Sequence, residues 1–437
     1  MKCGWRLMVV VAVVGVLGSA AARAADDNAP AGPVTFYKDV LPILQQNCQA
    51  CHRPDGDNYT GMVAPMSLLT FEEVRPWAKS IAQVVSERRM PPWFASEEQA
   101  GHFLNERRLS EAEIGTLVRW VELGAQRGRA EDAPPPRDFA SRGPWMIGEP
   151  DLVVKIEPYF VEDSVEDQYI TLRAPALTEE QLSEDRWVQA IEWKGGSPVV
   201  HHIVGYAFAP GSEIDESRRY GLGSIAPGEE PLVFPPGHAK RLLKGSVIVF
   251  SMHYHKEPGP GTGQWDQSMV AFKFVPEGEK VEHLVDYNGI SNGGFEIPPG
   301  HPEWTVGAAR TFPEDTTILG FHPHMHLRGK DARYVAYYPD GTKEVLLHVP
   351  RWDFNWQTYY AFREPKRIPA GTRIEYTARF DNSAANPANP NPTIPVRFGG
   401  PTTDEMMIGY ISYTHTEPRD LDKLYAEHGE ALIAGRR

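Results

Sequence analysis

Cysteine is scarce in this sequence. Its 437 residues include only three cysteines, and Cys3 lies within the first few positions. A disulfide framework is therefore excluded, so Cys48 and Cys51 must serve another purpose. Basic residues are also in deficit, since 44 Lys and Arg face 58 Asp and Glu, which gives a formal net charge of -14. Such an acidic chain argues against nucleic acid as a partner.

Long hydrophobic runs are missing as well. The 11-residue run LMVVVAVVGVL follows a basic start and precedes small residues that end at Ala24. It is too short to span a bilayer comfortably, because a membrane helix needs roughly 20 apolar residues. The pattern predicts a secretory signal peptide over residues 1–24, cut after Ala24 or Ala25. We therefore expect a periplasmic or secreted protein with no membrane span after processing.

The character of the sequence changes near residue 145. Before it, Thr70 with Glu73 and Ser110 with Glu113 have the spacing of helix capping boxes, and Gly124 is a natural helix stop. After it, short alternating runs such as GSVIVFSMHYH are separated by Pro, Gly, Asn and Asp, a pattern typical of antiparallel sandwiches. The expected fold is an all-α domain over residues 35–130, a charged proline-rich linker over 131–144, two all-β, jelly-roll-like sandwiches over 145–290 and 291–420, and a tail over 421–437.

The stretch NCQACHRPDG carries the attachment motif of c-type haem. Cys48 and Cys51 would form two thioethers, and His52 would supply the proximal nitrogen. The alternatives are a redox dithiol, which would need a strand before it, and half a zinc site, which would need a second cysteine pair. Residues 36–125 resemble small bacterial cytochrome c domains, so the all-α domain is expected to be cytochrome c-like.

The sixth haem ligand is left open among three methionines. Met62, Met66 and Met90 all follow the attachment motif. Met90 lies between the two expected helices, where cytochromes of this kind present their methionine, and the prolines after it would stiffen that loop. Met90 is therefore favoured, while Met66 in APMSLL is either the ligand or a core residue.

Histidines concentrate in three stretches of the β region. Residues two apart on a strand share one face and can chelate one ion, although an isolated His-x-His on a strand usually holds no metal. Their concentration in one exported region favours a metal function. The stretches contain His201 and His202, then His253 and His255, and then His322, His324 and His326.

Ligand chemistry narrows the metal. Imidazoles suit copper or zinc, and a thioether such as that of Met406 selects Cu(I) over zinc. A blue-copper site is excluded because it needs a cysteine thiolate, and both remaining cysteines belong to the haem motif. All-histidine copper, copper held by histidine and methionine, and a three-histidine zinc site of the hydratase type remain open.

The stretches VVHHIVGY, FSMHYH, HMHLRGK and DEMMIGY occur in this order over residues 145–420. Their order resembles that of the copper type II monooxygenases, the family of peptidylglycine α-hydroxylating and dopamine β-monooxygenase. The resemblance implies two copper ions, one for electron transfer and one that binds oxygen. Its implied ligands are His201, His202 and His253 for the first copper, with His255 as the alternative to His253, and His324, His326 and Met406 for the second.

The resemblance also implies what this chain acts on. Peptide-hydroxylating members hold a substrate carboxylate with an arginine and an asparagine at the positions of His322 and Ile408, which argues against a peptidylglycine substrate. Tyr410 keeps a hydroxyl that could face substrate. The sequence thus predicts a monooxygenase that hydroxylates a small organic molecule with O2, with haem, or a periplasmic donor through haem, supplying electrons. The alternatives are a non-catalytic electron-transfer or copper-binding protein and a zinc hydratase or hydrolase.

Overall fold

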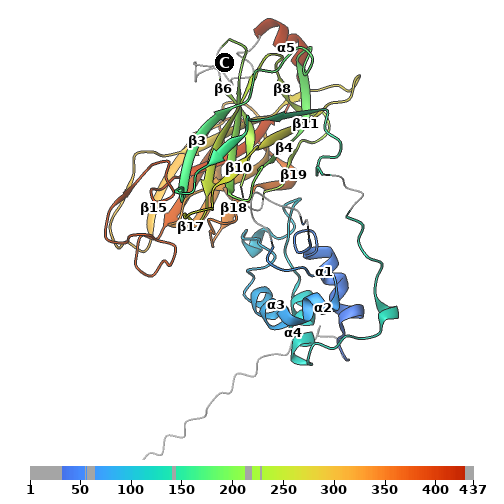
Figure 1. Cartoon of the computed structure of the whole chain (residues 1–437). Helices are drawn as coiled ribbons and strands as arrows, with labels where there is room; N and C mark the ends of the chain where they lie inside the picture. The colour runs from blue at the N-terminus through green and yellow to red at the C-terminus, as the bar shows by residue number, and fades with distance from the viewer. Residues whose placement is uncertain are drawn as a thin grey trace, which may run out of the picture.

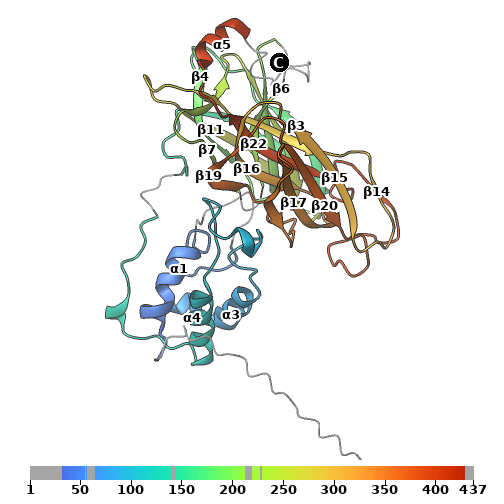
Figure 2. The same ribbon diagram turned by 180° about the vertical axis from the view of Figure 1, so that it is seen from behind.

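The computed structural model describes residues 32–54, 56, 64–139, 144–211, 219–226 and 229–428. The expected signal peptide, Met62 and residues 429–437 lie outside this described part. The helices α1 to α4 gather below the sheets in Figure 1, and the opposite view in Figure 2 shows the same separation. Within the described ranges, no helix has both the length and the apolarity that crossing a membrane requires.

The helical part consists of short helices around one core. Thr70 and Ser110 begin α2 and α4 with the two predicted capping boxes, and Gly124, at a φ of 87°, follows the end of α4. Phe36 and Trp120 are fully buried between the helices and form the centre of this core. The elements are η1 (Phe36–Val40), α1 (Leu41–Asn47), α2 (Phe71–Val74), η2 (Arg75–Trp77), α3 (Ala78–Ser86), η3 (Glu97–Gln99), α4 (Glu111–Glu122) and η4 (Ala130–Asp132).

Two sheets enclose the first β core. One has the strand order β1-β11-β4-β8-β12, with β7 beside β4, and the other has the order β3-β9-β5-β6. Trp193 and Phe250 meet between them edge to face at 5.0 Å. Gly205 has to be glycine, because a Cβ there would overlap the Trp193 indole. The strands are β1 (Leu152–Lys155), β2 (Tyr159–Val161), β3 (Asp167–Arg173), β4 (Arg186–Lys194), β5 (Val200–Phe208), β6 (Arg219–Ile225), β7 (Leu232–Val233), β8 (His238–Leu242), β9 (Val247–His255), β10 (Gln264–Asp266), β11 (Met269–Phe274) and β12 (His283–Leu284).

Two further sheets enclose the second β core. Their strand orders are β13-β22-β16-β19 and β15-β20-β17-β18. Phe321 and Tyr334, one from each sheet, lie 4.3 Å apart between ring centres. The remaining elements are β13 (Asp286–Ser291), β14 (Glu296–Ile297), β15 (Trp304–Thr311), β16 (Thr316–His324), β17 (Gly329–Tyr337), β18 (Lys343–Val349), β19 (Tyr360–Ile368), β20 (Arg373–Phe380), β21 (Val396–Arg397), β22 (Ile408–His415) and α5 (Leu421–His428).

The fold class expected from the sequence is wrong. The described chain is mostly β, and its four larger sheets form two pairs in which strands of the two sheets alternate along the chain. Its helices are few and short, and no all-α cytochrome domain is evident in the described ranges. The segment between α3 and α4 leaves the helical core, because Trp93 and Phe103 are buried in the second β core instead. The β units are also not separate sandwiches, since Leu319 of β16 packs in the first core.

The chain passes from one β core to the other within a few residues. Val285 belongs to the first core and Ile290 to the second, so the expected division at residue 290 falls inside β13. The expected tail begins as α5, whose Leu421 packs against Ala239 and Val281 of the first β unit. Because β13 follows the first unit directly and also lies against β6, the two β units are held close together.

Candidate metal centre

Three histidines converge at the paired ends of β5 and β9. A register shift between Val200 and His202 places one extra residue, His201, in β5. Successive strand residues normally point to opposite faces, but a bulge turns His201 and His202 to the same side. His202 lies directly opposite His253. The Nδ1 atom of His202 is 3.4 Å from Nδ1 of His201 and 3.2 Å from Nδ1 of His253.

These separations fit one metal ion. At metal–nitrogen distances of about 2.0–2.1 Å, two imidazole nitrogens on one tetrahedral or trigonal ion lie about 3.3–3.6 Å apart. The ligand atoms of His201, His202 and His253 all lie within 4.8 Å of one another. His255 is instead 58% exposed at its side chain, and its Nδ1 faces Asp167 at 3.7 Å. The three-histidine cluster, His201, His202 and His253, can therefore hold a metal ion.

Asp167 orients the His253 ring. Its Oδ1 pairs with Nε2 of His253, which leaves Nδ1 of that ring for a metal. Its Oδ2 accepts a hydrogen bond from Thr402 Oγ1 at 2.9 Å. The Tyr169 ring stacks on a face of the His253 ring, with 4.1 Å between the ring centres. The sequence did not reveal Asp167, because it sits on β3, distant along the chain from every histidine stretch.

His324 and His326 form a second cluster at the end of β16. Their rings stand almost perpendicular with centres 5.3 Å apart, within the range of about 4.5–5.5 Å that two imidazoles on one ion span. The Nδ1 of His324 lies 2.6 Å from Gln357 Oε1, and the Nδ1 of His326 lies 3.3 Å from the Asp404 carbonyl oxygen. Both rings therefore keep Nε2 for a metal. Gln357 comes from an irregular loop and gave no sequence signal.

Glu405 brings Met406 beside this pair. One Glu405 oxygen accepts hydrogen bonds from the backbone N–H groups of His326, at 2.8 Å, and Met406, at 3.2 Å. The ladder between β16 and β22 ends at the pair His324 and Ile408, two residues from His326 and from Met406. We call His324, His326 and Met406 the two-histidine cluster. The backbone N–H groups of His326 and Met406 therefore share one acceptor, which keeps these two stretches of chain close together.

Burial keeps the five histidines of the two clusters in their neutral form. It lowers the pKa of His201 and His326 to about 3 and that of His324 to about 4. Burial also lowers the pKa of His202, with neighbouring histidines adding to the effect, and it lowers the pKa of His253 against the opposing effect of Asp167. Neutral imidazole is the form that binds metal, so five ligands are available at neutral pH.

The two clusters share one site. The ring centres of His202 and His324 are 6.3 Å apart. Phe354 stacks on His201 at 5.0 Å and meets His326 edge to face at 6.2 Å, so a single aromatic ring contacts both clusters. The structure therefore brings together the residues that the sequence had assigned to two separate β units.

His322 lies beside the clusters and has other partners. Its Nδ1 is 2.7 Å from the Tyr287 hydroxyl and 3.2 Å from Glu229 Oε1. Tyr410, opposite His322 in the ladder, stacks on Tyr287 at 5.1 Å. Burial raises the pKa of Glu229 to about 8. A buried polar network that includes Tyr410 thus borders the two-histidine cluster.

The cysteine motif forms a turn at the end of α1. The N–H groups of Cys51 and His52 donate to the Cys48 carbonyl oxygen, at 3.2 and 2.9 Å. Burial raises the pKa of the Cys48 thiol to about 12, with Cys51 and Glu113 adding to the effect. The raised pKa keeps the Cys48 thiol protonated at neutral pH, unlike the thiolate of a reactive redox dithiol.

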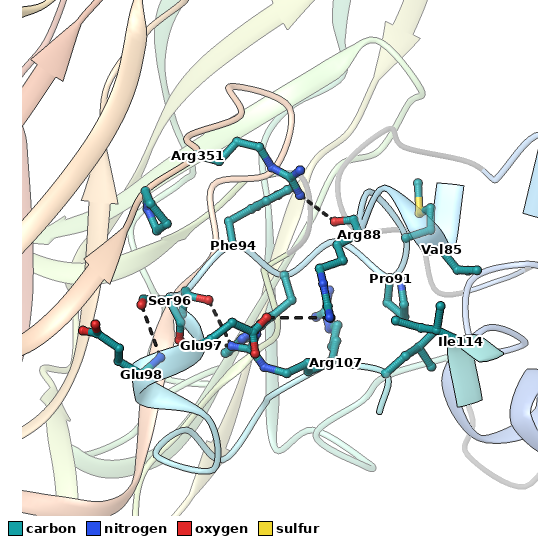
Figure 3. Close-up of a pocket in the computed structure, with 16 residues that line it drawn as sticks. Val85, Arg88, Pro91, Phe94, Ser96, Glu97, Glu98, Arg107, Ile114 and Arg351 are labelled. Atoms are coloured by element: carbon teal, nitrogen blue, oxygen red, sulfur yellow. Dashed lines mark hydrogen bonds and ion pairs between the residues drawn. The ribbon is translucent and has the colours of Figure 1, made fainter. Parts of the chain in front are cut away.

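The structure describes His52 and two of the three candidate methionines, Met66 and Met90. The Nδ1 of His52 is 3.4 Å from the Met66 carbonyl oxygen, and burial lowers its pKa. That contact places the Met66 backbone at the Nδ1 edge of the ring and leaves Nε2 for another ligand. Met90 lines a cavity of about 450 Å³ between the helical part and the second β unit, together with Val85 and Ile114 (Figure 3). Met62 lies outside the described residues.

The fold and the site define a mostly β protein with a buried histidine centre. No family model matches the chain, and no curated protein does either. Solved structures give weak likenesses. Empty particles of cowpea mosaic virus match at a TM-score of 0.29 and 5% identity, covering 65% of this chain and 98% of theirs. A two-domain protein of unknown function from Bacteroides fragilis matches at 0.15 and 8% identity, covering 63% and 99%. Likenesses this low carry no argument.

Proposed function

We propose that this chain is an exported copper monooxygenase. It hydroxylates a C–H bond of a small organic substrate, putting one atom of O2 into the product while two electrons and two protons reduce the other atom to water. Electrons pass from a c-type haem to the three-histidine cluster and then to the two-histidine cluster. The observation that carries the proposal is the meeting of two unlike sets of neutral histidines, each half-buried or buried, in one site.

The donor sets favour copper over zinc. Three imidazoles without a thiolate suit a copper that changes oxidation state, and two imidazoles with a thioether suit Cu(I). Copper, when bound, supplies one-electron redox chemistry and activation of O2. The two clusters offer different ring nitrogens to a metal. Nδ1 atoms converge in the three-histidine cluster, whereas Nε2 atoms remain for a metal in the two-histidine cluster. This difference supports one electron-transfer copper and one oxygen-binding copper.

The chain's own residues position these ligands. Asp167 holds the His253 ring, Gln357 holds the His324 ring, and Glu405 holds the backbone of His326 beside that of Met406. Such partners keep each ring in one tautomer and lower the cost of changing oxidation state.

The substrate site is proposed beside Met406 and Tyr410. Tyr410 is half-buried and belongs to the polar network of His322, Tyr287 and Glu229, so one wall of the site is polar. His322 stands where the peptide-hydroxylating members have an arginine, so a free carboxylate would meet a neutral ring here instead of a fixed cation. A small organic substrate without a carboxylate fits this wall better than a peptide terminus.

The helical part is proposed to hold the haem. Cys48 and Cys51 would attach it, and His52, with Nδ1 facing a carbonyl, would supply Nε2 to iron. Met90 is the sixth ligand that the sequence favours, and the Met66 backbone lies at the Nδ1 edge of the His52 ring, away from Nε2. A periplasmic donor protein would reduce the haem.

The test begins with metal content. Protein matured in a bacterial periplasm should contain about two copper ions per haem iron and should consume O2 with an accepted substrate. Met406→Leu should abolish hydroxylation while the haem stays reducible. Met407→Leu is the matched control, since Met407 is fully buried in the second core. Zinc in place of copper would indicate a hydratase, and copper without substrate-dependent O2 uptake would indicate a non-catalytic protein.

A further inference from the structure

A loop between β18 and β19 touches both the helical part and the metal centre. We call residues 350–359 the bridging loop. At one end, the Arg351 side chain donates to the carbonyl oxygens of Glu87, at 3.1 Å, and Arg88, at 2.6 Å. Figure 3 shows this side chain reaching across the cavity rim to Arg88. Both carbonyls stand within three residues of Met90, the preferred haem ligand.

The other end of the bridging loop rests on the histidines. The Phe354 ring is nearly parallel to His201, at an interplanar angle of 11° and a centre separation of 5.0 Å. Gln357 is only 1% exposed, and its Nε2 donates to the Phe354 carbonyl oxygen at 3.3 Å while its Oε1 meets His324. Buried Gln357 therefore fixes Phe354 against the three-histidine cluster.

We propose that the bridging loop is the electron route from the helical part to the three-histidine cluster, with Arg351 and Phe354 as its contact residues. This inference rests on the proposed function. Electronic coupling falls steeply across gaps and slowly through bonds. From Met90 the route follows the backbone to the Arg88 carbonyl, crosses one hydrogen bond to Arg351, and follows the loop to the Phe354 ring on His201. One electron moves: haem Fe(II) is oxidised to Fe(III) and Cu(II) is reduced to Cu(I).

The other contact between the helical part and the sheets leads elsewhere. Trp93 packs edge to face on Tyr360 at 5.0 Å and lies in the second β core with Phe103. Neither ring contacts a histidine of the two clusters in the described chain. Phe354, by contrast, lies directly on a ligand ring, so the bridging loop is the more direct route.

The experiment follows haem oxidation after a flash. A photogenerated flavin semiquinone reduces the haem of the full-length protein loaded with haem and Cu(II), and the decay of ferrous haem absorbance gives the transfer rate. Arg351→Ala and Phe354→Leu should each slow this decay about tenfold or more, because small gaps in a positioned contact cost large factors in rate. Copper content and haem potential should stay unchanged, and copper-free protein should show no decay.

Arg363→Ala is the matched control. Arg363 likewise donates to two backbone carbonyls, those of Gly101 and Phe103, both at 3.2 Å, but these belong to the segment between α3 and α4 that packs on the second β core, and Arg363 lies outside the bridging loop. Its decay should match the wild type. If Arg351→Ala and Phe354→Leu also keep the wild-type rate, the proposed route is refuted while the monooxygenase stands. A wild-type protein without haem or copper would overturn both.

Discussion

Removing the Asp167 carboxylate should weaken metal binding at the three-histidine cluster. Asp167 supports only one of its ligands, His253, whose Nε2 it pairs with. Without it, nothing in the described structure keeps that ring's proton on Nε2, so Nδ1 would be free to carry the proton in place of a metal. Loss of such a partner typically costs 10–100-fold in metal affinity, about 1.4–2.7 kcal/mol. Asp167→Ala should therefore lose about that much.

A graded series separates charge from geometry. Asp167→Asn keeps an acceptor for His253 but no charge, so its affinity should fall between wild type and Asp167→Ala. Thr402→Val removes the 2.9 Å hydrogen bond to the other Asp167 oxygen and the hydrogen bond with Tyr169, but leaves Asp167 paired with His253, so it should change affinity little. Competition titration of Cu(I) against a chelator of known affinity measures each variant. Wild-type affinity in Asp167→Ala would refute the idea that this carboxylate sets the His253 tautomer.

Three further changes test the rest of the structure. Burial raises the pKa of Glu229 to about 8 from an ordinary 4.5, so between these pH values the folded state binds the extra proton and the free energy of unfolding falls as pH rises, by up to about 1.4 kcal/mol per unit. Glu229→Gln should make the slope in urea unfolding at pH 5 to 8 shallower by the share of Glu229, while Glu405, whose pKa burial also raises to about 8, keeps its own share; an unchanged slope would refute the contribution of Glu229. Trp93→Ala should cost about 3–5 kcal/mol, measured by urea unfolding, since its indole is buried in the second core; a cost below 1 kcal/mol would contradict that packing. Cys48→Ala with Cys51→Ala should lose haem absorbance and turnover with physiological donors yet keep copper, and full turnover would refute the haem relay.

The local signals in the sequence were accurate where the chain is regular. The capping boxes at Thr70 and Ser110 appear in the structure because the side chains that satisfy a helix start lie within four residues of each other. The prediction of an all-α domain was wrong because Trp93 and Phe103 are apolar and could be buried equally well against helices or against sheets. Whether they pack on helices or on sheets depends on surfaces that fold from distant parts of the chain.

The candidate site shows the same division between local and distant information. Histidine spacing singled out three stretches, and the family resemblance implied which of their rings share an ion. The choice between His253 and His255 waited for the structure, because their burial depends on the neighbouring strand. Asp167 and Gln357 carried no signal, since a carboxylate or amide that orients a ligand needs only to be near it in space.

The distance between the two clusters is a consequence of how the β units meet. Each cluster is built within its own sheet, by the bulge in β5 and by the end of β16. The ring centres of His202 and His324 are 6.3 Å apart because the chain passes directly into β13. This strand pairs with β22 on one side and lies against β6 on the other. An electron that reaches His201, His202 and His253 therefore has only a ring-to-ring step left, so we expect delivery from the helical part, and not exchange between the clusters, to limit the rate.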